Sequence, residues 1–126
     1  MFCFPPAALL NGPDAWDGYL GLLPKDKHFE NAVAARIIPR ILFDYPGRAA
    51  AHINVPVLFA ICGKDTCAPS NPTLNYAKKA KKGKVIFYPD MGHFSIYQGE
   101  EFERATKDYT NFLLEYMPPP QVQAKL

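Results

Sequence analysis

One uninterrupted apolar run restricts the fold of this chain more than any other feature. The run extends from Val55 to Cys62. Hydrophobic residues without polar alternation are typical of a strand that is buried on both faces, as in a parallel sheet. A second strand is predicted over residues 84–88 and a helix over residues 72–82, with Gly83 ending that helix. The order strand, helix, strand therefore predicts a right-handed parallel unit of an α/β fold.

A long amphipathic helix is predicted after the second strand, over residues 100–117. Its apolar stripe comprises Phe102, Ala105, Tyr109, Phe112, Leu113 and Tyr116. Two parallel strands with flanking helices cannot bury both faces of a sheet or hide both of its edges. We therefore expect residues 53–117 to be the end of a larger sheet, followed by a tail over residues 118–126.

The region before the first strand, residues 1–52, is rich in proline and contains short helical patterns instead of strands. Asp14 is the predicted N-cap of a helix over residues 15–23. A second helical pattern runs over residues 31–43, and Pro39 is expected to interrupt it. Short apolar helices of this kind do not form a core by themselves. The region is therefore expected to cover another part of the protein.

Charge and hydropathy exclude several kinds of partner. The 126-residue chain has 14 basic and 12 acidic side chains, so its net charge of +2 gives no reason to expect nucleic acid as a partner. The basic cluster from Lys78 to Lys84 is predicted to be a solvated helix end. No apolar run reaches the roughly 18 residues that a membrane span requires.

The first residues and the cysteines indicate a cytoplasmic protein. Residues 1–10 are apolar but lack the basic start and the small-residue cleavage pattern of a signal peptide. The three cysteines, Cys3, Cys62 and Cys67, are an odd number without a framework spacing, which favours reduced thiols. Because Cys62 and Cys67 do not form a C-x-x-C pair, neither a zinc site nor another cofactor is predicted.

Polar side chains with catalytic potential follow both predicted strands. Asp65 comes shortly after the first strand, and His93 lies in the loop after the second. The carboxyl ends of parallel strands meet at one edge of a sheet, so we expect these two side chains to meet. A carboxylate that accepts a hydrogen bond from one ring N–H of a histidine fixes its tautomer, and the other ring nitrogen then serves as a general base.

Each of these residues also has a simpler interpretation when it is taken singly. Asp65 alone would be a turn residue, and His93 alone would be an ordinary loop histidine. A metal site on the two would need more ligands than the sequence visibly supplies. The remaining candidates are weaker: Asp90 is expected to form a loop turn, Asp108 to be solvated on the last helix, and His28 and His52 to be structural or exposed.

Two motifs resemble the end of the α/β-hydrolase fold. They are Gly63-Lys64-Asp65 after an apolar strand and Gly92-His93-Phe94 after the next strand. In that family the chain order is nucleophile, acid, histidine. The resemblance implies that Asp65 is the triad acid, that His93 is the triad base, and that residues 1–52 are a lid or cap remnant with the segment that returns to the sheet. It implies an ester-type bond in a small apolar or acyl substrate.

The nucleophile of such a triad is missing from this sequence. The family carries it on a sharp turn written G-x-Nuc-x-G. Ser70, Ser95 and Cys3 lack the flanking glycines. Asp65 approaches the pattern as a nucleophile itself, but Cys67 replaces the last glycine, and residues 68–72 are not expected to begin a helix directly. The oxyanion hole would also come from sequence outside these residues.

Three functions remain open from the sequence. The first is a C-terminal portion of a serine hydrolase that supplies the acid and the histidine and is inactive alone. The second is a non-catalytic module, derived from a hydrolase, that pairs with another chain through an open sheet edge. The third is complementation by a separately encoded N-terminal part.

Overall fold

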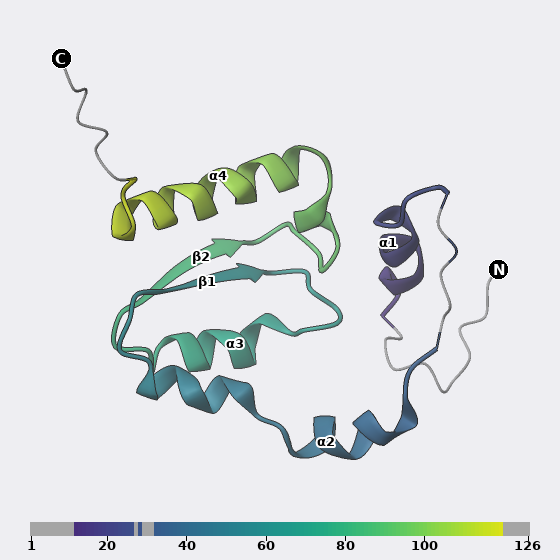
Figure 1. The fold of residues 1–126 in the computed structure, drawn as a ribbon, viewed down its shortest axis with the longest axis horizontal. Coiled ribbons are helices and arrows are strands. Elements are labelled where there is room, and N and C mark those ends of the chain that lie inside the picture. Colours follow the sequence, from purple (N-terminus) through teal and green to yellow (C-terminus); the bar gives the residue numbers. More distant parts are fainter. Residues whose placement is uncertain (1–11, 27, 29–31, 120–126) are drawn as a thin grey trace.

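A two-stranded parallel sheet forms the centre of the computed structural model, which describes residues 12–26, 28 and 32–119 (Figure 1). Strand β1 (Val57–Cys62) pairs with strand β2 (Gly83–Tyr88), and the register runs from Val57 opposite Gly83 to Cys62 opposite Tyr88. Helix α3 (Ser70–Ala77) connects the two strands, and helix α4 (Gly99–Tyr116) follows β2. The predicted strand–helix–strand–helix order and the mixed α/β class are therefore confirmed.

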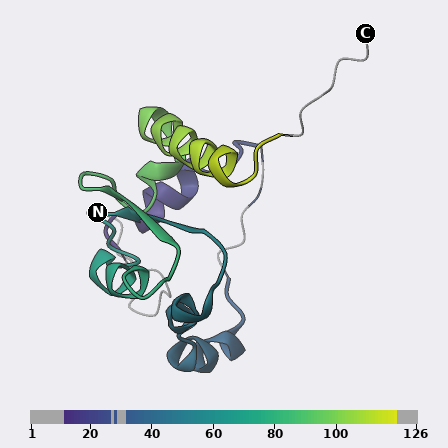
Figure 2. The same cartoon turned by 90° about the vertical axis from the view of Figure 1, so that its left-hand side faces the viewer.

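The two faces of the sheet are covered by different helices, because successive side chains of a strand point to opposite faces. On one face, Cys62 and Tyr88 form a buried cluster with Met91, Ile96 and Ala105, and Ala60, Ile86 and Tyr109 pack against it. Ala105 and Tyr109 belong to α4. On the other face, Ala77 at the end of α3 and the ring of Phe59 both lie close to Gly83, the first residue of β2. Figures 1 and 2 show these two helices on either side of the strands.

The boundaries of the predicted elements shift by a few residues. Helix α3 begins at Ser70, directly after Pro69, and ends at Ala77, so the expected range of 72–82 was wrong at both ends. The expectation that residues 68–72 could not begin a helix was also wrong. Pro72 is compatible with the first turn of α3, since the N–H groups there have no partner within the helix. Gly83 does not terminate this helix but is the first residue of β2.

The region before the sheet contains short helices, as predicted, although two details differ. Helix α1 covers Ala15–Gly21 and so ends two residues before the predicted end at residue 23. Helix α2 (Ile38–Phe43) follows a 3-10 turn over Ala35–Ile37. Pro39 lies in the first turn of α2 and does not interrupt it. A further 3-10 helix, Pro46–His52, leads to the sheet. The predicted start of the second pattern at Asn31 and the tail beyond Pro119 lie outside the described residues.

Much of the apolar surface is left uncovered by the described residues. On α4, Phe102, Leu113 and Tyr116 remain exposed, although they belong to the predicted apolar stripe. On β2, Val85 and Phe87 are exposed as well. The first four residues of β1 are only partly buried, so the prediction of a fully buried strand holds only for its last two residues. No helix in the described part of the chain is long and apolar enough to cross a membrane.

Candidate functional site

Backbone hydrogen bonds hold the two loops at the carboxyl edge of the sheet side by side. The ladder continues beyond the strands, because the N–H of Gly63 donates to the carbonyl of Tyr88 (2.8 Å) and the N–H of Lys64 donates to the carbonyl of Met91 (3.0 Å). Gly63 is required at this crossing, because a Cβ atom there would lie 2.7 Å from the carbonyl oxygen of Pro89. The loops that carry Asp65 and His93 are thus fixed relative to each other.

Asp65 and His93 are in direct contact at this edge. Nδ1 of His93 lies 2.9 Å from Oδ2 and 3.1 Å from Oδ1 of Asp65. The Asp65 side chain retains 12% of its surface exposed and the His93 side chain 30%. The carboxylate is therefore the less accessible partner, and the imidazole extends further toward solvent. This contact agrees with the geometry expected from the topology of the sheet.

The Asp65 carboxylate is held by the turn that follows it. Its Oδ1 atom accepts hydrogen bonds from the backbone N–H groups of Cys67 (2.9 Å) and Ala68 (2.6 Å). Such an arrangement fixes the side chain without a charged partner. An oriented carboxylate that accepts Nδ1–H from His93 leaves the Nε2 atom of the imidazole available to accept a proton.

Ser95 gives the histidine loop its shape. The Ser95 hydroxyl accepts a hydrogen bond from the N–H of Gly92 (2.9 Å) and donates to the carbonyl of the same residue (3.2 Å). These contacts close the turn around His93. A hydroxyl used in this way supports the prediction that Ser95 is not a nucleophile.

Helix α1 lies beside the same loops (Figure 1). Phe94 is buried and packs edge-on against the imidazole of His93, with a distance of 4.9 Å between ring centroids, and it also contacts Tyr19 of α1. Asp14 is the N-cap residue of α1, as predicted, but its side chain forms no capping hydrogen bond. Its carboxylate instead accepts a hydrogen bond of 2.5 Å from the hydroxyl of Thr66 and so connects the N-terminal region to the Asp65 loop.

Cys67 belongs to this site, although no site role was predicted for it from the sequence. Ligand atoms of Asp65, Cys67 and His93 all lie within 4.8 Å of one another, and the three residues are partly buried. Cys67 has no C-x-x-C partner, so its spacing to the other cysteines predicts no metal site. The Asp-x-Cys spacing is the sequence signal that could have identified Cys67. A turn that folds around an Asp carboxylate brings the residue two positions later close to that carboxylate.

The Cys67 thiol is not an activated nucleophile. Partial burial raises its pKa, a hydrogen bond with Thr66 lowers the pKa, and the charges of Asp14 and Asp65 raise it further. A reactive cysteine requires the opposite environment, one that favours the thiolate. The raised pKa of Cys67 thus gives no support to Cys67 as a replacement for the missing serine.

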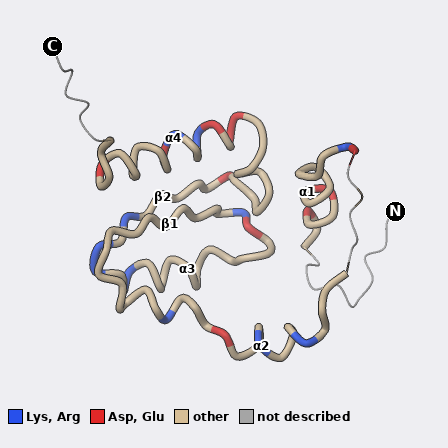
Figure 3. The backbone as a smooth tube through the Cα atoms, in the orientation of Figure 1, with Lys and Arg blue, Asp and Glu red and all other residues tan. Residues whose placement is uncertain are grey.

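The other candidate residues lie apart from this pair. Asp90 forms an exposed ion pair with Lys64 (3.0 Å). Asp108 is only partly exposed and accepts a hydrogen bond of 2.8 Å from Tyr88, so the expectation that it would be solvated was wrong. His28 and His52 are exposed. The lysines between α3 and β2 gather at the end of the sheet opposite the Asp65–His93 pair (Figure 3).

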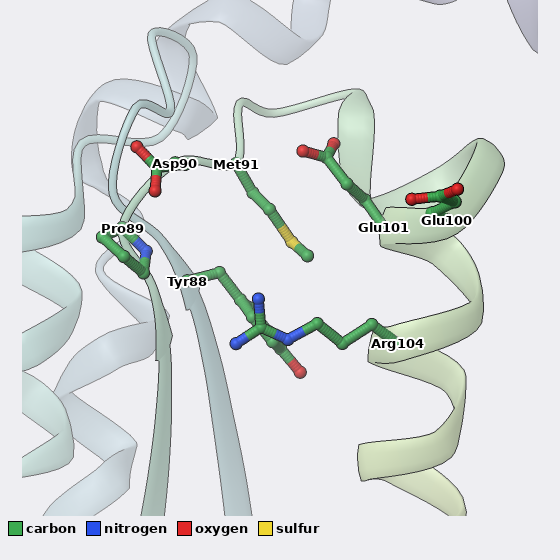
Figure 4. A pocket seen from close by; sticks show the side chains of 7 residues that line it. All are labelled: Tyr88, Pro89, Asp90, Met91, Glu100, Glu101 and Arg104. Carbon is green, nitrogen blue, oxygen red and sulfur yellow. The ribbon is translucent and has the colours of Figure 1, made fainter.

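A shallow pocket of about 250 Å³ lies on the other side of the histidine loop (Figure 4). It is lined by Tyr88, Pro89, Asp90, Met91, Glu100, Glu101 and Arg104. The guanidinium of Arg104 lies over the ring of Tyr88, 5.2 Å from its centroid. Neither member of the Asp65–His93 pair lines this pocket. This pocket is therefore separate from the Asp65–His93 pair.

The chain is similar to one curated protein of greater length. It is 45% identical over 111 residues to the "Quorum-quenching protein AidA" of Acinetobacter baumannii (strain MDR-ZJ06). The matched region covers 88% of this chain and 36% of that relative. No family model matches the chain, and no solved structure matches it.

Proposed function

We propose that this chain is the C-terminal portion of an α/β-hydrolase and supplies two residues of its catalytic triad. Asp65 is the acid, and His93 is the general base. The observation that carries the proposal is the 2.9 Å contact between Oδ2 of Asp65 and Nδ1 of His93, with the carboxylate anchored by two backbone N–H groups. An ordinary ion pair at the protein surface would not require a carboxylate that is held in place by two backbone N–H groups.

The proposed mechanism follows from the orientation of the imidazole. Asp65 accepts the Nδ1–H of His93, which leaves Nε2 to take a proton from an attacking hydroxyl. The imidazolium that forms is stabilised by the negative carboxylate, and it returns the proton to the leaving group. The attacking hydroxyl and the oxyanion hole would come from sequence outside these 126 residues, on a strand-to-helix turn that precedes the acid in chain order.

The proposal assigns a role to each region of the chain. Residues 53–117 are the C-terminal part of the hydrolase core, residues 1–52 are the lid with the segment that returns to the sheet, and residues 118–126 are a tail. The substrate is a small apolar or acyl compound with an ester-type bond. The position of α1 beside Phe94 supports a lid that borders the histidine. No cofactor takes part.

The similarity to a quorum-quenching protein suggests the biological setting. That relative is much longer than the matched region, which leaves room for a nucleophile elsewhere in its chain. We propose that the complete protein acts in quorum quenching, and that it does so by hydrolysis.

A chimera tests this proposal directly. The matched segment of the Acinetobacter protein is replaced by this chain, and the product is assayed for ester hydrolysis and for quorum quenching in reporter bacteria. We expect activity in the chimera, and a loss of about 10³-fold or more in kcat/KM for His93→Ala and Asp65→Asn, as is typical for members of a triad. A serine-directed covalent probe should label the chimera but not the 126-residue chain.

Matched variants separate a catalytic effect from a general loss of folding. Asp90→Asn removes an exposed carboxylate of the same histidine loop, and His52→Ala removes an exposed histidine outside the site. Both should retain activity within about twofold. If His93→Ala were as active as these controls, or if the isolated chain were labelled only when folded, the proposed roles would be wrong.

A second function is favoured by one specific observation. Each strand has a single partner among the described residues, and apolar side chains on β2 and α4 remain exposed. A non-catalytic module could use this open edge to pair with another chain. In that case the isolated chain would be folded and would bind a partner, and neither Asp65→Asn nor His93→Ala would alter the binding.

A further inference from the structure

We propose that Asp65, Cys67 and His93 form a binding site for a thiophilic divalent cation of the zinc type. The site uses the acid and the base of the proposed triad, but it goes beyond the proposed function because it requires the Cys67 side chain. Their ligand atoms lie within 4.8 Å of one another.

The donor set matches the preferences of zinc. A thiolate, an imidazole nitrogen and a carboxylate oxygen are its three usual ligand types, and three protein ligands with one open position form a common zinc site. Two anionic ligands and one neutral ligand balance the charge of a divalent ion. Magnesium and calcium require several oxygen ligands, and this cluster offers a single carboxylate. The class of ion is therefore set by the sulfur.

The geometry requires only a small adjustment. In a tetrahedral zinc site, neighbouring ligand atoms lie about 3.3 to 3.6 Å apart, given the usual bond lengths. The distance of 2.9 Å between Nδ1 of His93 and Oδ2 of Asp65 would have to increase slightly. The Cys67 sulfur, which lies within 4.8 Å of the other two ligand atoms, would have to move closer to them. The turn that holds the Asp65 carboxylate also carries Cys67, whose N–H donates to Oδ1 at 2.9 Å. Two of the three ligands are therefore already fixed relative to each other.

Binding of the cation and the proton-transfer role of His93 exclude each other. A cation at Nδ1 removes the hydrogen bond to Asp65, and a cation at Nε2 occupies the nitrogen that would accept the proton. Zinc is therefore expected to inhibit the complete enzyme. That consequence rests on the proposed function, whereas the binding of the cation itself does not.

Cobalt titration of the 126-residue chain tests the binding without any substrate. Cobalt replaces zinc in such sites, and its bond to a thiolate gives a charge-transfer absorption in the near ultraviolet. We expect one cobalt ion per chain, displaced by zinc and not by magnesium. Cys67→Ser should abolish the absorption and weaken zinc binding by more than about 100-fold. Loss of a residue that binds the metal directly lowers the affinity more than loss of a residue that only orients such a ligand.

Three control variants identify the ligands. Cys3→Ser, Asp90→Asn and His52→Gln remove the same chemical groups elsewhere in the chain and should leave binding unchanged, whereas Asp65→Asn and His93→Gln should each weaken it by at least about tenfold. The proposal is overturned if the unmodified chain gives no thiolate absorption, if Cys67→Ser retains it, or if Asp65→Asn and His93→Gln bind like the controls.

The inhibition is measured separately in the chimera. Each variant is compared with its own rate in the absence of zinc, and Cys67→Ser should require more than about 100-fold more zinc for half inhibition. A chimera without hydrolase activity would contradict the proposed function and leave the cobalt result standing. Cobalt binding that fails in an active chimera would contradict only the metal site.

Discussion

At the scale of single residues, Tyr88 shows how one side chain joins the sheet to α4. It is fully buried, and its hydroxyl donates a hydrogen bond of 2.8 Å to Oδ2 of Asp108. Burial raises the pKa of Tyr88 well above its ordinary value, and the hydrogen bond to Asp108 raises it further. The neutral phenol is therefore the form that the fold requires.

Tyr88→Phe should reveal this requirement in the pH dependence of stability. At pH 7 the variant should lose about 1 kcal/mol of unfolding free energy, because the hydrogen bond to Asp108 disappears. The tyrosine of the unfolded chain ionises near pH 10, while Tyr88 of the folded chain stays protonated. The stability that Tyr88 contributes is thus complete below pH 10 and is lost as the pH rises further.

Denaturant unfolding between pH 7 and pH 11 measures this difference. Above pH 10, the unmodified chain should lose about 1.4 kcal/mol per pH unit more than Tyr88→Phe, which is the value for one titrating group. Tyr97→Phe, at an exposed position, is the control and should keep the slope of the unmodified chain. Parallel curves for the unmodified chain and Tyr88→Phe would contradict the assignment.

At the scale of secondary structure elements, the contact between α1 and the histidine loop depends on a glycine. Gly18 faces Phe94, and a Cβ atom there would collide with the Phe94 ring. Phe94 in turn packs against His93. The absence of a side chain at position 18 therefore allows the helix to approach the loop that carries the histidine.

Gly18→Ala should separate α1 from this loop. We expect a loss of about 1 to 3 kcal/mol of unfolding free energy from overpacking, together with faster amide hydrogen exchange in α1 and a shifted His93 imidazole resonance. Gly21→Ala is the matched control, because its Cβ would meet the flexible end of Gln98 at 3.0 Å. It should be neutral, or stabilising by up to about 1 kcal/mol through helix propensity. Equal exchange in the two variants would contradict the close contact.

At the scale of the whole molecule, exposed apolar side chains are the dominant feature. They occur on α1, on α2, on β2 and along α4, where Phe102, Leu113 and Tyr116 leave the apolar stripe only partly covered. Large apolar side chains that are exposed in such number mark places where other protein normally packs. The proposed larger hydrolase and the proposed interaction module both account for it.

Binding of an apolar dye should show how much of this surface is open to solvent. The isolated chain should increase the fluorescence of such a dye and should associate at high concentration, whereas the chimera with the Acinetobacter protein should do so far less. The expected cause is coverage of β2 and α4 by the added sequence. A chain that is monomeric, folded and unreactive to the dye would contradict an open apolar surface on β2 and α4.

Local patterns in the sequence determined the order of the elements and the pairing of the loops. The apolar run around β1 and the breakers at its end were sufficient to predict a parallel unit. Parallel topology in turn predicted that Asp65 and His93 would meet, since carboxyl ends of parallel strands lie at one edge. The catalytic roles of the two residues remain predictions.

Contacts between distant segments were decided only by the tertiary structure. Asp14 is the N-cap residue of α1, but its side chain bonds to Thr66 and not to the helix backbone. Asp108 accepts a hydrogen bond from Tyr88 and is only partly exposed. Cys67 joins the Asp65–His93 pair, although its spacing to Cys62 suggested no site. Hydrophobic periodicity and residue propensity carry information only about neighbours along the chain. The contacts of Asp14, Asp108 and Cys67 join segments that are brought together by tertiary packing, so local patterns cannot predict them. A sequence therefore predicts which loops meet, whereas the side chains that complete the site depend on the fold.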